Sequence, residues 1–257
     1  MRKSIWQVLL VTFYCLVTSS ACIAETIWGY QAVRPDGNGS HPLVNAPAYD
    51  SNENLIEGNK VTIEGVALAG MDELWNPASQ YIAFVQDDTY DRGGIEIWAG
   101  NFGWYQPPVV WRPAQYVPFN AGDRIRVTGF LGDHAGKVFI NDRHCNDLDV
   151  CFTVEVIGHP GMPDPELIPS ISNCNYFDQT RNDGGERYQT RWTMLHGVQI
   201  TGGVWANNKT LTISDATGSV SLFLPPMGDF NSSTQPTGRM SIVGIFDQED
   251  PGSGVPV

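Results

Sequence analysis

The stretch YIAFVQDDTYDRGGIEIW, residues 81–98, has a counterpart in TLTISDATGSVSLFLP, residues 210–225. In both stretches apolar residues alternate with polar ones, an Asp follows, a turn containing Gly comes next, and the alternation then resumes. A period of two predicts β-strands, and Asp followed by Gly predicts the turn of a hairpin. The same pattern at two places in one chain predicts two copies of one small β-structure.

The segments on either side of the two hairpins also correspond. KVTIEGVALAG, residues 60–70, matches RWTMLHGVQITGG, residues 191–203, with Gly65 opposite Gly197. A central Gly in a long first strand predicts a sharp bend or a bulge. After the hairpins, GDRIRVTGFL matches TGRMSIVGIF. This layout predicts an all-β fold with two five-stranded Greek-key barrels in tandem.

The first copy resembles the OB-fold modules that occur singly and in tandem in secreted bacterial proteins. The resemblance is carried by VTIEGVALAG, YIAFVQDD, GGIEIW and AGDRIRVTGFLGDHAGKVFI. These hold a mid-strand Gly, an aromatic-x-x-Asp hairpin and a GD-x-apolar-x-V-x-G segment before the last hairpin. The resemblance covers residues 60–158 and, less fully, residues 191–248. It implies modules that bind nucleic acids or other ligands and that are attached to other domains.

The two copies differ at their ends. GDHAGKVFIND predicts a hairpin and a fifth strand in the first copy, whereas VGIFDQEDPGSGVPV reaches Val257 before a fifth strand can form. Either the sequence is a fragment or the second barrel stays open with an exposed edge. We favour the fragment, and we expect the second barrel to lack its last strand.

The N-terminus predicts a signal peptide over residues 1–24. Arg2 and Lys3 precede a short apolar run, small residues follow, and we place the cleavage after Ala24. Cleavage after Ala21 would instead expose Cys22 for lipidation, which we favour less. We therefore expect a bacterial protein that is secreted or held at the cell surface, with no transmembrane segment.

The mature chain is divided by composition into four parts. Residues 25–59 are rich in Gly, Pro and Asn and predict an irregular lead-in. Residues 60–158 form the first OB-fold domain. Residues 159–190 hold a proline-rich, stiff linker and a second lead-in. Residues 191–257 form the second, truncated OB-fold domain.

The net charge argues against unselective nucleic-acid binding. Removal of Arg2 and Lys3 with the leader leaves 13 basic against 28 acidic residues, a formal charge of −15. A chain of this charge repels polyanions, and neutralisation of phosphates supplies most of the affinity in unselective nucleic-acid binding.

Three cysteines follow the leader: Cys145, Cys151 and Cys174. Cys145 and Cys151 enclose NDLDV, so we predict a small disulfide loop between them, which leaves Cys174 over. No cofactor is predicted. Calcium is a weaker alternative for the Asp-rich turns at residues 86–94 and 141–149, where Asp and Asn are also typical turn residues.

The densest group of aromatic residues is WAGNFGWYQPPVVWRPAQYVPF, residues 98–119, between the third and fourth predicted strands. Flat rings on a barrel can stack on sugars or bases, or the segment can fold back and plug the barrel end. The predicted ligand-binding residues are Trp98, Phe102, Trp104, Tyr105, Trp111, Arg112, Gln115 and Tyr116.

We predict a secreted, non-catalytic OB-fold module that binds an oligosaccharide or another extended polymer. One alternative is a module for single-stranded nucleic acid. Another is a structural spacer or interaction unit of a larger cell-surface protein. An enzyme such as a nuclease is disfavoured because G-x-S-x-G and H-E-x-x-H motifs are absent. The neighbours Asp133 and His134 are interpreted as turn residues.

Overall fold

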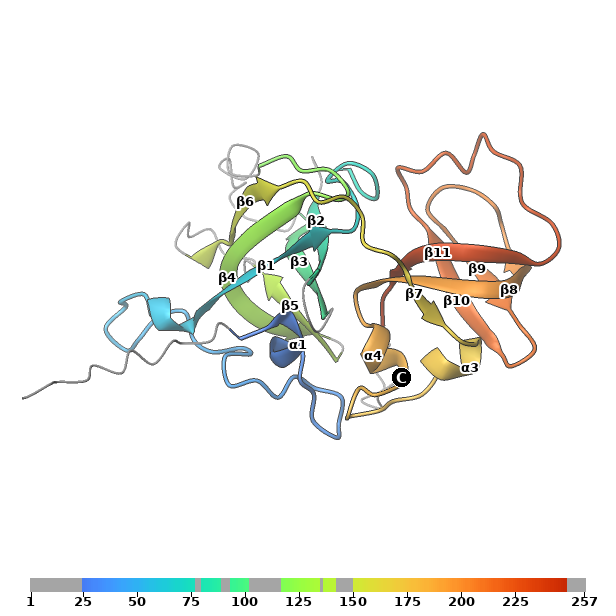
Figure 1. Ribbon diagram of the computed structural model, residues 1–257. Helices are drawn as coiled ribbons and strands as arrows, with labels where there is room; N and C mark the ends of the chain where they lie inside the picture. The colour runs from blue at the N-terminus through green and yellow to red at the C-terminus, as the bar shows by residue number, and fades with distance from the viewer. Residues whose placement is uncertain are drawn as a thin grey trace, which may run out of the picture.

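The computed structural model describes residues 25–76, 80–88, 93–101, 117–134, 136–141 and 150–248. Two β-units lie side by side, and an extended segment crosses from one to the other (Figure 1). Strands dominate the described regular structure, and each described helix has only three or four residues. The predicted all-β class is therefore confirmed. Within the described residues, no helix has the length and apolar character needed to cross a bilayer.

The first unit is a closed five-stranded barrel in which the strand order is β1-β2-β3-β5-β4 and β4 returns to pair with β1. Only the β3–β5 pair is parallel. This order is that of an OB-fold. A sixth strand, β6, pairs with the other edge of β4. The strands are β1 (Lys60–Ala67), β2 (Gln80–Gln86), β3 (Gly94–Asn101), β4 (Arg124–His134), β5 (Lys137–Asn141) and β6 (Thr153–Gly158).

The barrel interior is filled by the apolar residues that alternate along these strands. Tyr81 and Val85 point inward from β2, and Ile95 and Ile97 do so from β3; all four are at most 1% exposed. The alternation that predicted the strands thus also selects the face that is buried. Gly65 is required in β1 because a Cβ there would meet the Gln86 carbonyl oxygen at 2.5 Å.

The lead-in is more ordered than predicted. It contains the helix α1 (Ile27–Tyr30), the 3₁₀ helix η1 (Glu57–Asn59) and two isolated β-bridges. Ile27 and Tyr30 are buried and join the core of the first barrel. Ile27 and Tyr30 become buried only through their contact with the barrel. The local sequence of the lead-in does not reveal this contact.

The second unit is a sheet in the order β10-β9-β8-β11, with all these pairs antiparallel. Its strands are β8 (Arg191–Gly203), β9 (Lys209–Ser214), β10 (Ser219–Leu224) and β11 (Met240–Phe246). A bulge in the β8–β11 pairing lies next to Gly197, which has a φ of +68°. A glycine adopts this left-handed conformation without strain, so the central Gly marks a bulge here as predicted.

The proline-rich linker contributes a strand to the second unit. Residues 159–190 were expected to hold only a linker and lead-in, but β7 (Glu166–Ile168) pairs in parallel with β8. Two short helices follow, α3 (Ile171–Cys174) and α4 (Gly185–Tyr188). The prolines flank β7 rather than interrupt it, so Ile168 can be buried against the sheet.

The second sheet is not closed within the described residues. No described strand pairs with the outer edge of β10 or with the corresponding edge of β11. Val220, Leu222 and Ile242 are only half-buried, although they pack against the buried Ile171, Val198 and Ile213. Residues 249–257 lie outside the described part of the chain.

The two units meet where the linker enters β8. Thr190 is fully buried with a φ of +55°, an uncommon conformation for a β-branched residue. Its carbonyl oxygen lies against Gly94 at the start of β3, where a Cβ would overlap it. On the lead-in side, the Arg181 guanidinium lies 3.9 Å from the centre of the Trp28 ring and donates a 2.6 Å hydrogen bond to the Trp28 carbonyl oxygen.

Gly94→Ala is expected to destabilise the protein by about 1–3 kcal/mol, because the new methyl group overlaps the Thr190 backbone and forces the two units apart. The free energy of unfolding in urea measures this effect. The control is Gly58→Ala, where no atom lies within 4 Å of the new Cβ. Equal stabilities of the two variants would contradict the contact.

Candidate ligand-binding face

The outer face of β2, β3 and β5 presents three rows of side chains. Because alternate residues fill the barrel, the residues between them point outward. The register places Ile82 beside Trp98, Phe84 beside Glu96, and Gln86 beside Gly94. The parallel strand β5 extends the first two rows, with Asn141 beside Trp98 and Phe139 beside Glu96. Lys137 continues the third row by alternation.

The first row and the two phenylalanines that flank Glu96 in the second row form a largely aromatic surface, which we call the aromatic face. Trp98 and Phe139 meet edge to face, with ring centroids 6.2 Å apart and planes at 89°. Ile82, Phe84, Trp98 and Asn141 are half-buried, whereas Phe139 is 7% exposed. The aromatic face therefore consists of Ile82, Phe84, Trp98, Phe139 and Asn141.

The third row is covered by the second unit. The Trp192 backbone N–H donates a 2.7 Å hydrogen bond to the Gln86 side-chain oxygen, and Thr190 lies on Gly94. The face is therefore closed at the end where β3 begins, while the aromatic rows lie toward the end of β3.

A buried cation joins the covered row to the second unit. Lys137 Nζ lies 2.5 Å from Glu96 Oε2 and 2.8 Å from Asp247 Oδ2. The Lys137 and Glu96 side chains are 5% and 9% exposed, and Gln189 donates a 3.1 Å hydrogen bond to Asp247. A buried ion pair of this kind contributes little net stability but penalises any arrangement that separates the charges. It therefore fixes how the second unit sits on the face.

Of the eight predicted ligand-binding residues, one, Trp98, lies in the described part of the chain. Trp98 is on the aromatic face as described above. The other seven, Phe102, Trp104, Tyr105, Trp111, Arg112, Gln115 and Tyr116, lie outside the described residues. In the sequence they follow Asn101, the last residue of β3. Phe84 and Phe139 were missed by sequence analysis; strand register places both in the row next to that of Trp98.

The disulfide between Cys145 and Cys151 stays a prediction, because Cys145 lies outside the described residues. Cys151 is buried. Cys174 is also buried, its thiol lies 3.1 Å from the Ile171 carbonyl oxygen, and burial raises its pKa to about 11. In the described part of the chain, no group of three or more His, Cys, Asp or Glu side chains could hold a metal ion.

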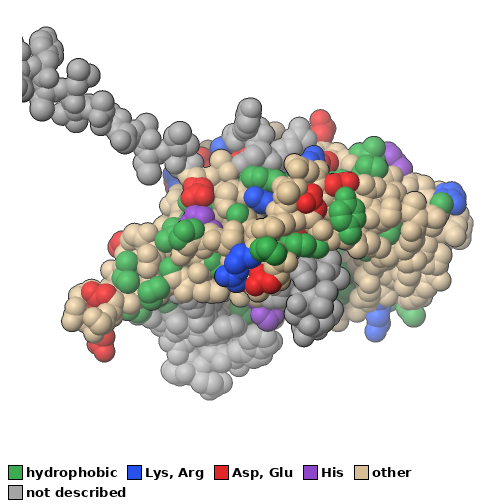
Figure 2. Space-filling view, turned by 90° about the horizontal axis from the view of Figure 1, so that it is seen from below, with side chains coloured by type: hydrophobic (Ala, Val, Ile, Leu, Met, Phe, Trp, Pro, Cys, Tyr) green, Lys and Arg blue, Asp and Glu red, His purple; other side chains and the backbone are tan. Residues whose placement is uncertain are grey.

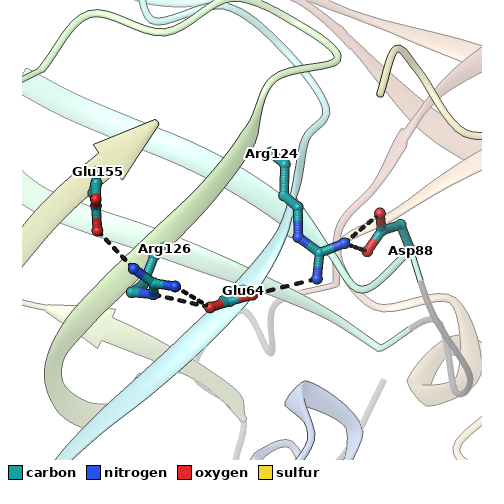
Figure 3. Close-up of polar contacts among 5 residues, drawn as sticks. All are labelled: Glu64, Asp88, Arg124, Arg126 and Glu155. Atoms are coloured by element: carbon teal, nitrogen blue, oxygen red, sulfur yellow. Dashed lines mark hydrogen bonds and ion pairs between the residues drawn. The ribbon is translucent and has the colours of Figure 1, made fainter. Parts of the chain in front are cut away.

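The opposite side of the barrel carries a ladder of alternating charges (Figure 3). Arg124 binds both oxygens of Asp88, at 2.6 and 2.7 Å, and approaches Glu64 at 3.4 Å. Arg126 binds Glu64 at 2.7 Å and Glu155 at 2.8 Å. The Arg126 hydrogen bond is the main cause that lowers the pKa of Glu64. Both arginines are thus held by carboxylates, which reduces their attraction for phosphate.

The remaining described cations are mostly neutralised in the same way. Arg187 and Arg191 both contact Glu166, and Lys60 pairs with Glu57. On the face drawn in Figure 2, the described basic side chains are few and scattered. The described residues on this face therefore form no basic stripe of the kind that is typical of proteins that bind nucleic acids mainly through phosphate contacts.

A polar hollow of about 490 Å³ lies between the lead-in and the end of β4. It includes Asp133 and His134, the neighbours that we interpreted as turn residues. Asp133 accepts a hydrogen bond from the Gly39 backbone N–H, so this carboxylate anchors the lead-in. The hollow is lined by Arg34, Asn38, Gly39, Val44, Asn45, Asp133 and His134.

No protein-family model and no curated protein sequence matches this chain. Solved structures that are similar include the tetrameric p202 HIN2, with 15% identity over 70% of this chain and 80% of that chain and a TM-score of 0.28. A HINa domain in complex with 20-bp double-stranded DNA has 12% identity over 62% and 72%, with a TM-score of 0.28. A murine DNA-binding protein bound to double-stranded DNA has 9% identity over 73% and 99%, also with a TM-score of 0.28. The OB-like fold of this chain is identified by its own strand order and register.

Lys137→Met is expected to lower the free energy of unfolding by about 3–5 kcal/mol, because it removes the cation that contacts the buried Glu96 carboxylate; Asp247, which is 35% exposed, adds less to this loss. Chemical denaturation measures the change. Lys209→Met removes an exposed lysine and is expected to change stability by less than about 0.5 kcal/mol. If Lys137→Met and Lys209→Met lowered the free energy of unfolding by similar amounts, the stabilising role of the Lys137 ion pairs would be contradicted.

Because of Glu186, the free energy of unfolding should fall as pH rises. Burial raises its pKa from 4.5 to about 7 in the folded protein, against the lowering effects of a Gln248 hydrogen bond and of Arg181. The folded state therefore binds this proton more tightly than the unfolded state, and the stabilisation present below pH 4.5 is lost as pH rises to about 7. Glu186→Gln should remove this loss, with a gain near 3 kcal/mol at pH 8 by order of magnitude.

Urea unfolding at several pH values between 4 and 8 tests the Glu186 prediction. Glu57→Gln is the control, because it removes an exposed carboxylate and should leave the pH dependence unchanged. A pH dependence that persists in Glu186→Gln would show that another group causes it.

Proposed function

We propose that this chain is a non-catalytic binding module that takes up an extended polymer on the aromatic face of the first barrel. The observation that carries the proposal is the edge-to-face contact of Trp98 with Phe139, with Phe84 on the same outer face of β2, β3 and β5. This face corresponds to the strand 2–3 surface on which OB-folds bind oligonucleotides and oligosaccharides.

An oligosaccharide is the ligand class that we propose first. Stacking of a sugar on an aromatic ring needs no compensating positive charge, whereas each phosphate of a nucleic acid does. The predicted mature chain has a charge of −15, and Arg124 and Arg126 are held by carboxylates. Secretion, which the N-terminal sequence predicts, would place such a module among extracellular glycans.

Single-stranded nucleic acid is the second candidate, because the same rings can stack on bases. Base stacking contributes about 1–3 kcal/mol per base and tolerates any sequence. Arg112 and Gln115, both in the predicted segment, would then add hydrogen bonds to the bases. Binding of this kind would depend more on stacking and less on phosphate contacts than in a basic OB-fold.

Trp98→Ala is expected to weaken polymer binding by at least about fivefold, since the loss of one stacking ring costs about 1–3 kcal/mol. Trp205→Ala is the matched control in the second unit, where Trp205 contacts Phe230 with centroids 5.2 Å apart. A glycan array, followed by calorimetry with the best ligand, measures the two variants. Equal binding by both variants and by the unaltered protein would exclude the aromatic face.

A salt titration distinguishes the two ligand classes. Binding of a neutral oligosaccharide should change little between 50 and 200 mM salt, whereas binding of a single-stranded oligonucleotide should weaken with salt. Tight oligonucleotide binding that is lost in Trp98→Ala, with no glycan bound, would establish the second candidate over the first.

A further inference from the structure

The polar hollow of about 490 Å³ lies between the end of β4 and the lead-in, which runs beneath the first barrel in Figure 1. Two turns of the lead-in border it, and backbone hydrogen bonds fix both. In the first turn, the Arg34 N–H donates to the Asn38 carbonyl oxygen at 2.8 Å. In the second, the Asn45 N–H donates to the Leu131 carbonyl oxygen at 3.1 Å. These bonds hold the walls of the hollow in place.

Asp133 of β4 joins the two turns to each other. Its Oδ2 accepts a hydrogen bond from the Gly39 N–H, and its own N–H donates to Asn45 Oδ1 at 3.3 Å. The chain can approach β4 so closely only at a glycine, because a Cβ on Gly39 would lie 2.7 Å from Val138 Cγ2. The hollow is therefore largely preformed, and a ligand that enters it needs to order little of the chain.

Several polar groups that line the hollow have no partner among the described residues. Asp133 and Asn45 each use one side-chain oxygen, which leaves Asp133 Oδ1 and Asn45 Nδ2. Arg34 contacts Asp36 through Nε at 3.4 Å, which leaves its two terminal nitrogens. The ring of His134 is exposed, and its nitrogens make no hydrogen bond to a described residue. The hollow thus offers one carboxylate acceptor together with several donors.

The lining favours a ligand that is uncharged and rich in hydroxyl groups. Arg34 and Asp133 carry opposite charges, so one of them repels a ligand with a net charge of either sign. Among the described lining residues Val44 is the one aliphatic side chain, and there is no Phe, Tyr or Trp ring on which a base could stack. A hydroxyl both donates and accepts, so neighbouring hydroxyls of a sugar can donate to Asp133 Oδ1 and accept from Asn45 and Arg34.

The hollow is separated from the aromatic face by most of β5. Asp133 pairs with Val138 near the start of β5, whereas Trp98 pairs with Asn141 at its end. Three residues of a strand span roughly 10 Å, at about 3.3 Å per residue. The volume of about 490 Å³ lies within the range of small-molecule sites, about 300–1,000 Å³. The hollow is thus a site of its own, with room for one or two sugar rings.

We propose that this hollow binds a small neutral saccharide, a mono- or disaccharide. Asp133 accepts hydrogen bonds from sugar hydroxyls, while Arg34 and Asn45 donate to them and His134 completes the rim. Hydrogen bonds to the charged Asp133 and Arg34 are the stronger ones and supply most of the affinity. The site lies apart from the aromatic face and does not rest on the proposed polymer binding.

The test titrates the full chain with glucose, galactose, mannose, N-acetylglucosamine, maltose and cellobiose, followed by NMR. We expect saturable binding of at least one of these sugars, with a dissociation constant on the order of 1 mM for so small a ligand. Sodium phosphate, as an anion, and glycine, as a zwitterion, are the comparison ligands and should not bind. Saturable binding of phosphate or glycine without binding of any sugar would overturn the proposal, and so would binding of none of these ligands.

Variants of the protein locate the site. Arg34→Ala and His134→Ala remove exposed side chains of the hollow, so both should fold normally and bind the sugar at least about fivefold more weakly. Arg239→Ala and His196→Ala are the matched controls in the second unit and should bind it as the unaltered protein does. Unchanged sugar binding in both hollow variants would overturn the proposal.

Trp98→Ala distinguishes this site from the aromatic face. If the sugar occupies the hollow, Trp98→Ala leaves its binding unchanged, whatever the variant does to polymer binding. A loss of sugar binding in Trp98→Ala alone would place the sugar on the aromatic face and exclude the hollow. Sugar binding that is lost in Arg34→Ala and kept in Trp98→Ala would support the hollow even if no polymer bound to the protein.

Discussion

The pairing of β4 with both β1 and β5 is the constraint on which the first barrel depends. β4 has 11 residues, more than any other strand of this unit. Its first half lies between β1 and β6, and its second half reaches β5. This length lets a strand that is fourth in sequence bring the two ends of the sheet together. Complete burial of Ile97, Ile125 and Ile140 follows, because each inward side chain then meets neighbours from every direction.

The second sheet is not closed within the described residues, and its comparison with the first barrel shows what closure contributes. β8 is long and bulged, and β11 pairs with it in the corresponding register. Nevertheless, Val220, Leu222 and Ile242 stay half-buried, although Val198 and Ile213 are buried, and no described strand lies between β10 and β11. β7 covers part of β8 but lies on the side of β9, so it cannot replace a fifth strand. The same local patterns therefore give a fully buried core in one unit and a partly buried apolar cluster in the described part of the other.

Local sequence patterns predicted the strands and turns. They could not predict contacts between residues that are far apart in the sequence. The hairpins around Asp87 and Asp215 follow from alternation and turn residues, which act over a few positions. β7 was missed because a three-residue strand between prolines has no periodicity of its own. Lys137 and Asp247 are 110 residues apart, and nothing near either residue indicates that they meet. Trp98 was predicted from aromatic density, whereas Phe139 joins it only through the parallel β3–β5 pairing.

The junction between the units determines how much of the first barrel can bind a ligand. The second unit covers Gln86, Gly94 and Glu96, so a polymer cannot follow the whole length of β3. What remains for the proposed ligand is the end toward Trp98, where Ile82 and Trp98 are apolar. A site confined to one end of the sheet favours a short contact dominated by stacking over a long contact along a charged backbone. This geometry agrees with the distribution of charge, in which the described arginines of the barrel are already paired with carboxylates.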